Sequence, residues 1–165
     1  MIEQQRQKRN QERLLELYPA FHKRLTKVIT ELEAMDVRPR IQDAYRSPAD
    51  QMIAYNSGHS QLKFGFHNVT GKNGQKESLA VDMLDDDNPM SLSISYLLKL
   101  AWASEKNGLK TGIRFGIKSQ VLIDGINAAI AAKNWSANVK VGWDPSHVEP
   151  TGISVSEAKA GKRPV

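Results

Sequence analysis

The strongest restriction on the fold comes from a stripe of apolar residues near the N-terminus. Its members are spaced alternately four and three residues apart, which places them on one face of a helix. Pro19 is expected to kink this helix or to start its second segment. A coiled coil would need a longer repeat with fewer aromatic residues, so we expect the helical segment 1–36 to pack on the domain's own core. The stripe comprises Leu14, Tyr18, Phe21, Leu25, Val28, Leu32 and Met35.

Short alternating stretches and capped helical stretches follow this segment without a regular βαβ repeat. We expect strands at 37–45, 78–83, 113–115 and 139–143, helices at 47–56, 91–108 and 119–133, and a long glycine-rich loop at 57–78. This order predicts a small single α+β domain over residues 1–150, with a mainly antiparallel sheet and helices packed against it. Residues 151–165 are small, polar and basic, and we expect them to form a mobile tail.

The composition limits how a metal could be used. A chain of 165 residues, 40% of them hydrophobic, can bury a core without disulfides or a structural metal. The absence of cysteine excludes a disulfide framework, a thiolate zinc site and a cysteine nucleophile. A metal would therefore be functional and would be held by His, Asp and Glu.

Charge and hydropathy bear on partners and location. The net charge of +5 and the pI near 9.5 favour contact with a polyanion, which nucleic acid, teichoic acid and lipopolysaccharide would all satisfy. The basic residues are spread along the chain without a helix-turn-helix or an aromatic RNA-binding signature, so no specific nucleic-acid partner is expected. The first residues are polar where a signal peptide would be apolar, and no transmembrane run occurs. We therefore expect synthesis in the cytoplasm.

The histidines suggest a zinc site at the sheet. Of the four histidines, His59, His67 and His147 lie in or beside loops or strand ends, whereas His22 is expected on a solvated helix face. A catalytic zinc takes about three protein ligands from His and carboxylate and leaves one position open. Asp82, on the expected strand 78–83, suits the third place. An isolated histidine is more often a surface or structural residue, so spacing alone leaves that alternative open.

Other polar residues could take part in chemistry. Asp144 or Glu149 could serve as the carboxylate that moves a proton beside a metal. Asp144 could equally be a turn residue before Pro145. Arg46 could bind a carboxylate or an oxyanion at the end of a strand, or pair with a surface acid.

Two further groups are open to more than one interpretation. The acidic run 85–88 could bind calcium, although a solvated turn before Pro89 is the simpler interpretation because the loop of an EF-hand is absent. Trp143 could stack on a sugar ring, whereas Trp102 and Trp135 are expected in the core.

Taken together, the motifs form one ordered pattern along the chain. The pattern is Tyr45-Arg46-Ser47, His67, Ala80-Val81-Asp82, Gly108-Leu109, Arg114-Phe115-Gly116 and Asp144-Pro145-Ser146-His147-Val148-Glu149. Over roughly residues 40 to 150 it resembles the zinc peptidases of peptidoglycan. That family includes D-alanyl-D-alanine carboxypeptidases and dipeptidases and the L-alanyl-D-glutamate endopeptidases used as phage endolysins.

The resemblance implies a role for each matched residue. His67, Asp82 and His147 would bind zinc, Asp144 would be the general base and acid, and Arg46 would stabilise the oxyanion or anchor the substrate. Together with the polar first residues, it leads us to expect a phage or prophage endolysin that is released through a holin and cuts the stem peptide of the cell wall between L-Ala and D-Glu. Because the N-terminal stripe is too short for a coiled coil, we expect a monomer. A D-alanyl-D-alanine carboxypeptidase is the alternative. A non-catalytic basic module that binds nucleic acid or cell wall is an alternative of another class.

This chain departs from the family pattern in two places. The family separates its first His from the Asp by six residues, whereas fourteen residues, 68–81, intervene here. We interpret 70–76 as a hairpin-like insertion, and His59 is the rival ligand if that interpretation fails. The stretch 120–140 is also longer than usual, and it could lie over the cleft.

Overall fold

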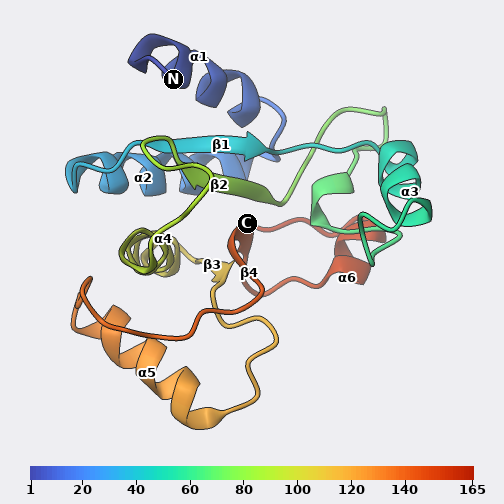
Figure 1. The fold of residues 1–165 in the computed structure, drawn as a ribbon. Coiled ribbons are helices and arrows are strands. Elements are labelled where there is room, and N and C mark those ends of the chain that lie inside the picture. Colours follow the sequence, from blue (N-terminus) through green and yellow to red (C-terminus); the bar gives the residue numbers. More distant parts are fainter.

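The computed structural model describes residues 1–165 and is built around a four-stranded antiparallel sheet of order β1-β2-β4-β3 (Figure 1). The strands are β1 (Pro39–Asp43), β2 (Val81–Asp85), β3 (Leu109–Gly112) and β4 (Asp144–Pro150). The two central strands, β2 and β4, place Asp82 directly opposite His147. The predicted α+β class with a mainly antiparallel sheet is confirmed, and two predicted metal ligands lie at its centre.

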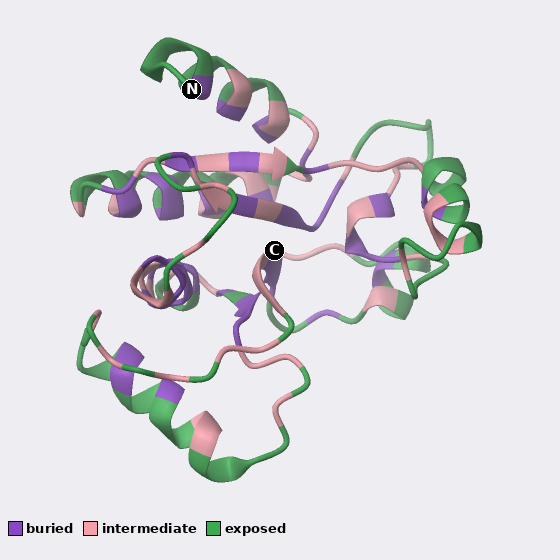
Figure 2. Cartoon of the chain, in the orientation of Figure 1, coloured by how far each residue is buried: buried purple, intermediate pink, exposed green.

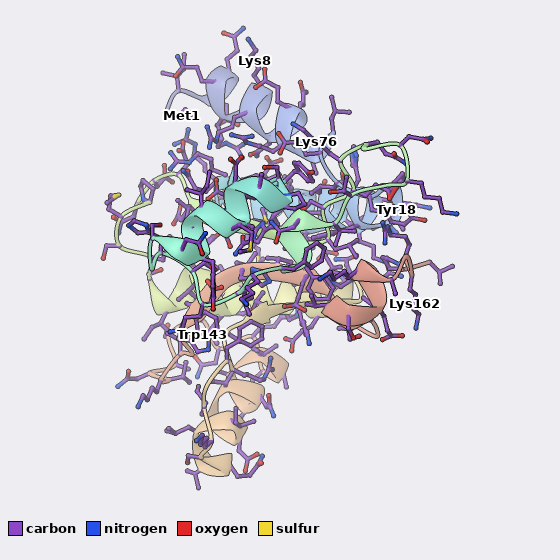
Figure 3. All side chains as sticks on the ribbon, turned by 90° about the vertical axis from the view of Figure 1, so that its right-hand side faces the viewer. Met1, Lys8, Tyr18, Lys76, Trp143 and Lys162 are labelled. Carbon is purple, nitrogen blue, oxygen red and sulfur yellow. The ribbon has the colours of Figure 1, made fainter.

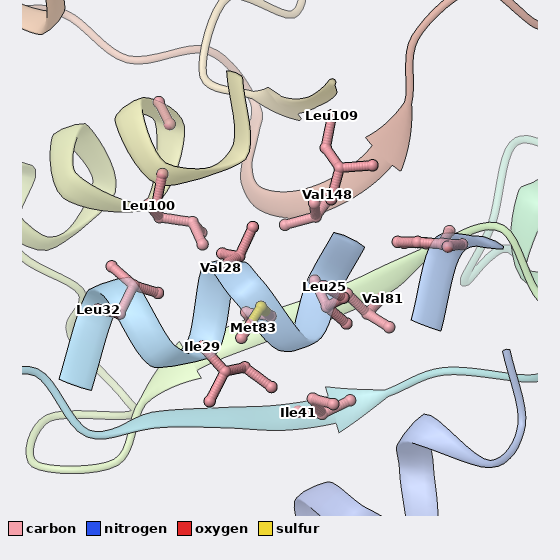
Figure 4. Close-up of a cluster of buried hydrophobic side chains, with 14 of the residues drawn as sticks. Leu25, Val28, Ile29, Leu32, Ile41, Val81, Met83, Leu100, Leu109 and Val148 are labelled. Atoms are coloured by element: carbon pink, nitrogen blue, oxygen red, sulfur yellow. The ribbon is translucent and has the colours of Figure 1, made fainter. Parts of the chain in front are cut away.

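The core forms where helices α2 (Pro19–Ala34) and α4 (Ile94–Lys106) pack against the sheet and against each other (Figure 4). Leu25, Val28 and Leu32 of α2 are fully buried beside Val81 and Met83 of β2. Each such side chain contributes about 1.5–3 kcal/mol by leaving water. The apolar face of α2 therefore packs on the chain's own core.

Helix α1 (Glu3–Leu14) is separate from α2 and lies along the outer edge of the sheet (Figure 1). Pro19 starts α2 rather than kinking a continuous helix. The amide of Asn10 joins the edge of β1, since its Oδ1 accepts from the Ile41 backbone N–H at 2.8 Å and its Nδ2 donates to the Pro39 carbonyl at 2.9 Å. Arg9 donates to the Ile41 carbonyl at 2.9 Å. These bonds satisfy backbone groups that an uncovered edge strand would leave open.

The acidic turn after β2 differs from the expected solvated turn. Asp86 is buried and accepts charge-assisted contacts from Arg38 at 3.1 Å and Arg40 at 2.9 Å. The amino group of Met1 lies 3.5 Å from the same carboxylate. Two arginines thus compensate the buried charge, and the turn ties α1 to the sheet.

Strands β3 and β4 do not lie where the alternation of apolar residues predicts them. β3 ends at Gly112, so the expected strand 113–115 is a turn, and β4 begins only at Asp144, after the expected strand 139–143. Instead of joining the sheet, the two segments bond to each other through their backbones, from the Gly142 N–H to the Ile113 carbonyl at 2.6 Å and from the Trp143 N–H to the Phe115 carbonyl at 3.1 Å. The alternating apolar residues line this loop pair, which explains the wrong placement.

The remaining helices are α3 (Pro48–Asn56), the 3-10 turn η1 (Phe66–Asn68), α5 (Gln120–Ala131) and α6 (Val155–Lys159). α3 begins as predicted, with the Ser47 hydroxyl accepting from the Asp50 N–H. α5 lies farthest from the sheet, and its buried positions form a narrow strip on an otherwise exposed helix (Figure 2). Trp102 and Trp135 meet edge to face at 6.1 Å and pack partly buried against the core.

The last fifteen residues form part of the folded unit rather than the expected mobile tail. α6 buries Ala158. Arg163 donates to the Glu77 carboxylate at 3.0 Å and to the Thr70 carbonyl at 3.2 Å. These contacts give the basic tail specific partners in the loop before β2, which its composition does not reveal.

None of the helices combines the length and the apolar character needed to cross a membrane.

Candidate metal centre

His67 is held in a defined orientation by η1 and by the strand end that faces it. Its ring Nδ1 lies 2.7 Å from the Ala44 carbonyl oxygen. A carbonyl can only accept, so Nδ1 carries a proton, and in the neutral ring Nε2 has the free lone pair. Nε2 lies 3.6 Å from Oδ2 of Asp82. The backbone therefore orients the ring with Nε2 toward the sheet.

His147 approaches the same carboxylate from the neighbouring strand. Its Nδ1 lies 3.5 Å from Oδ1 of Asp82, and the two imidazole rings are 5.3 Å apart, edge to face. Because Asp82 and His147 are cross-strand partners, the sheet itself sets their separation. His67 joins them from a loop that is distant in sequence.

Glu149 lies behind His147 and not at the cluster. Its Oε1 is 3.1 Å from His147 Nε2, the ring nitrogen that points away from Asp82. Glu149 is 8% exposed, and its other oxygen is 3.9 Å from the Lys110 ammonium. A carboxylate on one nitrogen of a histidine fixes the tautomer and orients the other nitrogen toward a metal. The sequence pattern singled out Glu149 as a rival base, and this geometry favours a positioning role.

The three side chains fit a metal ion. One ligand atom from each of His67, Asp82 and His147 can be chosen so that all lie within 4.8 Å of one another. Each histidine has one nitrogen engaged by an acceptor and the other directed at the shared carboxylate. Two imidazoles and one carboxylate are a donor set of catalytic zinc, in which a fourth position stays open. The ligand roles remain predictions, but the structure brings the three residues together.

The electrostatics of the metal-free cluster follow from burial and close charges. Burial alone would raise the pKa of Asp82, but contacts with His147 and His67 hold it below its usual range. Burial would lower the pKa of His147, yet Asp82 and Glu149 raise it from 6.5 to about 9. Zinc and this extra proton would compete for His147, because both bind the lone pair of Nδ1.

Asp144 lies at the rim of the cluster, with Oδ2 3.8 Å from His147 Nδ1. Burial, opposed by His147 and reinforced by Asp82, raises the pKa of the Asp144 carboxyl. Its position depends on Gly112, its partner on β3, where a Cβ would lie 1.9 Å from the Asp144 carbonyl oxygen. Only glycine permits this close approach of the two backbones. Asp144, unlike Glu149, is on the side of His147 that faces Asp82.

Arg46 adjoins the cluster through its backbone. Its N–H donates to the His67 carbonyl at 2.9 Å, and its own carbonyl accepts from the Asn68 side chain at 2.8 Å. The guanidinium donates to Gln51 at 3.1 Å and forms no ion pair, so the alternative of a surface salt bridge does not hold. The guanidinium therefore has no acidic partner within the chain.

The insertion before Asp82 forms the expected hairpin. Thr70 and Lys76 pair as an antiparallel bridge, and the Gly71 N–H donates to the Gln75 carbonyl at 2.8 Å. The chain on either side stays in register, so His67 reaches the sheet. The rival His59 is exposed, bonds its Nδ1 to Ser57 at 2.8 Å and is not part of the cluster.

Sequence reasoning missed two parts of this site. The Ala44 carbonyl, which orients His67, has no side-chain signal at all. Phe115 lies 6.1 Å from the His147 ring, whereas the sequence pattern included it in the 114–116 motif without giving it a role. Its place beside the cluster follows from the glycine contacts of the 112–116 turn, whose closeness to β4 only the fold reveals.

Comparisons with known proteins support the fold. No protein-family model matches the chain, and no curated protein matches it in sequence. The L-Ala D-Glu endopeptidase ChiX of Serratia marcescens is similar in structure, with a TM-score of 0.52 and 18% identity over 87% of this chain and 86% of that one. The vancomycin-resistance D,D-pentapeptidase VanY, solved with Zn(II), has a TM-score of 0.43 and 14% identity over 87% and 76% of the two chains. The chain shares its fold with the Serratia endopeptidase.

Proposed function

We propose that this chain is a zinc-dependent peptidase that hydrolyses the stem peptide of bacterial peptidoglycan, between L-Ala and D-Glu. The observation that carries the proposal is the convergence of His67, Asp82 and His147, each with a donor atom directed at one point, beside the carboxylate of Asp144. Polyanion binding would not require this cluster.

Each side chain of the site has a separate role in the proposed peptide hydrolysis. His67, Asp82 and His147 would hold zinc, which lowers the pKa of a bound water toward about 7 and polarises the substrate carbonyl. The Asp144 carboxylate accepts the proton of the attacking water and passes it to the leaving nitrogen, a task that suits a carboxyl whose pKa is raised. Arg46, which has no acidic partner, stabilises the oxyanion or anchors a substrate carboxylate. Glu149 keeps His147 in the metal-binding tautomer.

The choice of bond rests on the shared fold. The chain has the fold of an enzyme named as an L-Ala D-Glu endopeptidase, ChiX. We further propose that the chain acts as a phage or prophage endolysin, which a holin releases to the cell wall. The positive net charge would help such an enzyme to reach an anionic envelope.

Digestion of purified peptidoglycan tests the proposal. The wild-type chain is incubated with sacculi in the presence of zinc or a chelator, and the new peptide ends are identified by mass spectrometry. The proposal predicts new L-Ala carboxyl and D-Glu amino ends, with chelator and His147→Ala abolishing them and His59→Ala leaving them unchanged. Released D-Ala would move the assignment to a carboxypeptidase. No new ends at any zinc concentration would refute the peptidase.

A further inference from the structure

A pocket of about 430 Å³ lies between the 115–119 loop, the start of α5 and the 140–143 loop. It lies where the segments 113–115 and 142–143 bond to each other through their backbones, beside α5. The indole of Trp143, which forms one wall, is 73% exposed and lies between the body of the molecule and α5 (Figure 3). None of the residues invoked so far as metal ligands or as the proton carrier lines this pocket.

The pocket continues directly from the metal cluster. The ring of Phe115 lies 6.1 Å from the His147 ring on one side and 5.8 Å from the Trp143 ring on the other. Asp144 is the next residue after Trp143, so the carboxylate of the cluster's rim is joined by the backbone to the pocket wall. The pocket therefore adjoins the rim of the cluster at Asp144.

The pocket carries positive charge without a counterion. Lys118 and Lys140 line it and are exposed, and neither forms an ion pair or a hydrogen bond within the chain. No acidic side chain is among the lining residues. The first turn of α5 also borders the pocket, where the helix dipole is positive. Aromatic walls with two free ammonium groups suit a ligand that is partly apolar and carries carboxylate.

We propose that this pocket binds the leaving half of the substrate and recognises its free carboxylate through Lys118 and Lys140. This inference rests on the proposed function. Asp144 delivers a proton to the leaving nitrogen, so the leaving half extends from Asp144, toward the pocket. A glutamate whose nitrogen lies in the scissile bond has two carboxyl groups, and only one continues the peptide. The other is a carboxylate next to the bond being cut.

Two matched peptides test the charge recognition. Both contain the L-Ala–D-Glu bond. They differ only in the glutamate carboxyl that does not continue the peptide, which is free in one peptide and amidated in the other. The double variant Lys118→Ala/Lys140→Ala is compared with Lys23→Ala/Lys72→Ala, which changes the net charge equally at exposed lysines outside the pocket. The pocket variant should raise KM for the free acid about tenfold, with kcat nearly unchanged, and should leave the amide unaffected.

A binding measurement separates the two proposals. The D-Glu-containing leaving fragment is titrated into metal-free protein while the indole N–H signals of the tryptophans are followed by NMR. The Trp143 signal should shift, those of Trp102 and Trp135 should not, and the pocket variant should weaken this binding about tenfold. Equal binding of acid and amide, or loss only in the control variant, overturns the pocket assignment. Normal fragment binding without any hydrolysis by the wild type would refute the proposed function and leave the pocket standing.

Discussion

Zinc affinity should depend steeply on pH, because His147 must lose a proton before it can bind the metal. In the metal-free protein Asp82 and Glu149 raise the pKa of His147 to about 9, so the ring is protonated on both nitrogens at neutral pH. At pH 7 the expulsion of this proton costs about 2.7 kcal/mol, which corresponds to a factor of about 100 in affinity. Between pH 7 and 9 the affinity should rise about tenfold per unit.

Competition with a chromophoric chelator of known pH dependence measures this affinity from pH 6.5 to 9.5. Glu149→Gln removes one of the two carboxylates that stabilise the imidazolium, so the pKa of His147 falls and the pH dependence becomes shallower below pH 9. Glu157→Gln, which changes an exposed carboxylate of α6, is the control. An affinity that stays constant across this range in the wild type would refute the assignment of His147 Nδ1 as the site of competition.

Four further outcomes are expected. Asp144→Asn should retain zinc but lower kcat about 10²–10⁴-fold in a peptide assay, whereas full turnover would exclude it as the proton carrier. Gly112→Ala should lower the melting temperature and the activity together, since its Cβ would overlap the Asp144 carbonyl, and an unchanged melting curve would contradict the close packing. Arg163→Ala should destabilise the fold by about 1 kcal/mol in urea through loss of its Glu77 and Thr70 contacts, with Lys162→Ala as the control that leaves them intact. The stability that protonated His147 gives the metal-free protein is complete below pH 6.5 and is lost as pH rises through about 9, so thermal melts should show a decline over that window that saturating zinc removes.

Local signals predicted the elements that depend on neighbours in sequence. The Ser47 cap and Pro48 placed the start of α3, and the spacing of Phe21, Leu25, Val28 and Leu32 placed the buried face of α2. The central strand with Asp82 also followed from alternation, because one face of β2 is buried and the other carries the site. In each case the apolar residues recur with the period of the helix or strand, because one face of that element is buried.

Features that depend on contacts distant in sequence were not predictable. Val139, Val141 and Trp143 alternate like a strand, yet the glycines at 112 and 142 let two loops bond to each other instead. Likewise the tail 151–165 has the composition of a mobile segment, but Glu77 and the Thr70 carbonyl supply partners for Arg163. Alternation and composition describe a segment alone, whereas these outcomes depend on which segments meet it.

The candidate site likewise has residues that the sequence predicted and contacts that it did not. The resemblance to peptidoglycan peptidases singled out His67, Asp82, His147 and Asp144, and the fold brings these four side chains together. The contacts that orient the rings, from the Ala44 carbonyl to His67 and from Glu149 to His147, emerge only from the three-dimensional arrangement.

A zinc titration of the metal-free protein tests the central claim most directly. Hydrolysis of peptidoglycan is followed while zinc is added in known amounts per chain. We predict no activity without metal and a linear rise in activity that stops at one zinc per chain. The variants His67→Ala, Asp82→Ala and His147→Ala should each stay below the activity of the wild type at every amount of zinc. Full activity in the metal-free protein, or none at any amount of zinc, would contradict the assignment of this cluster as a catalytic zinc site.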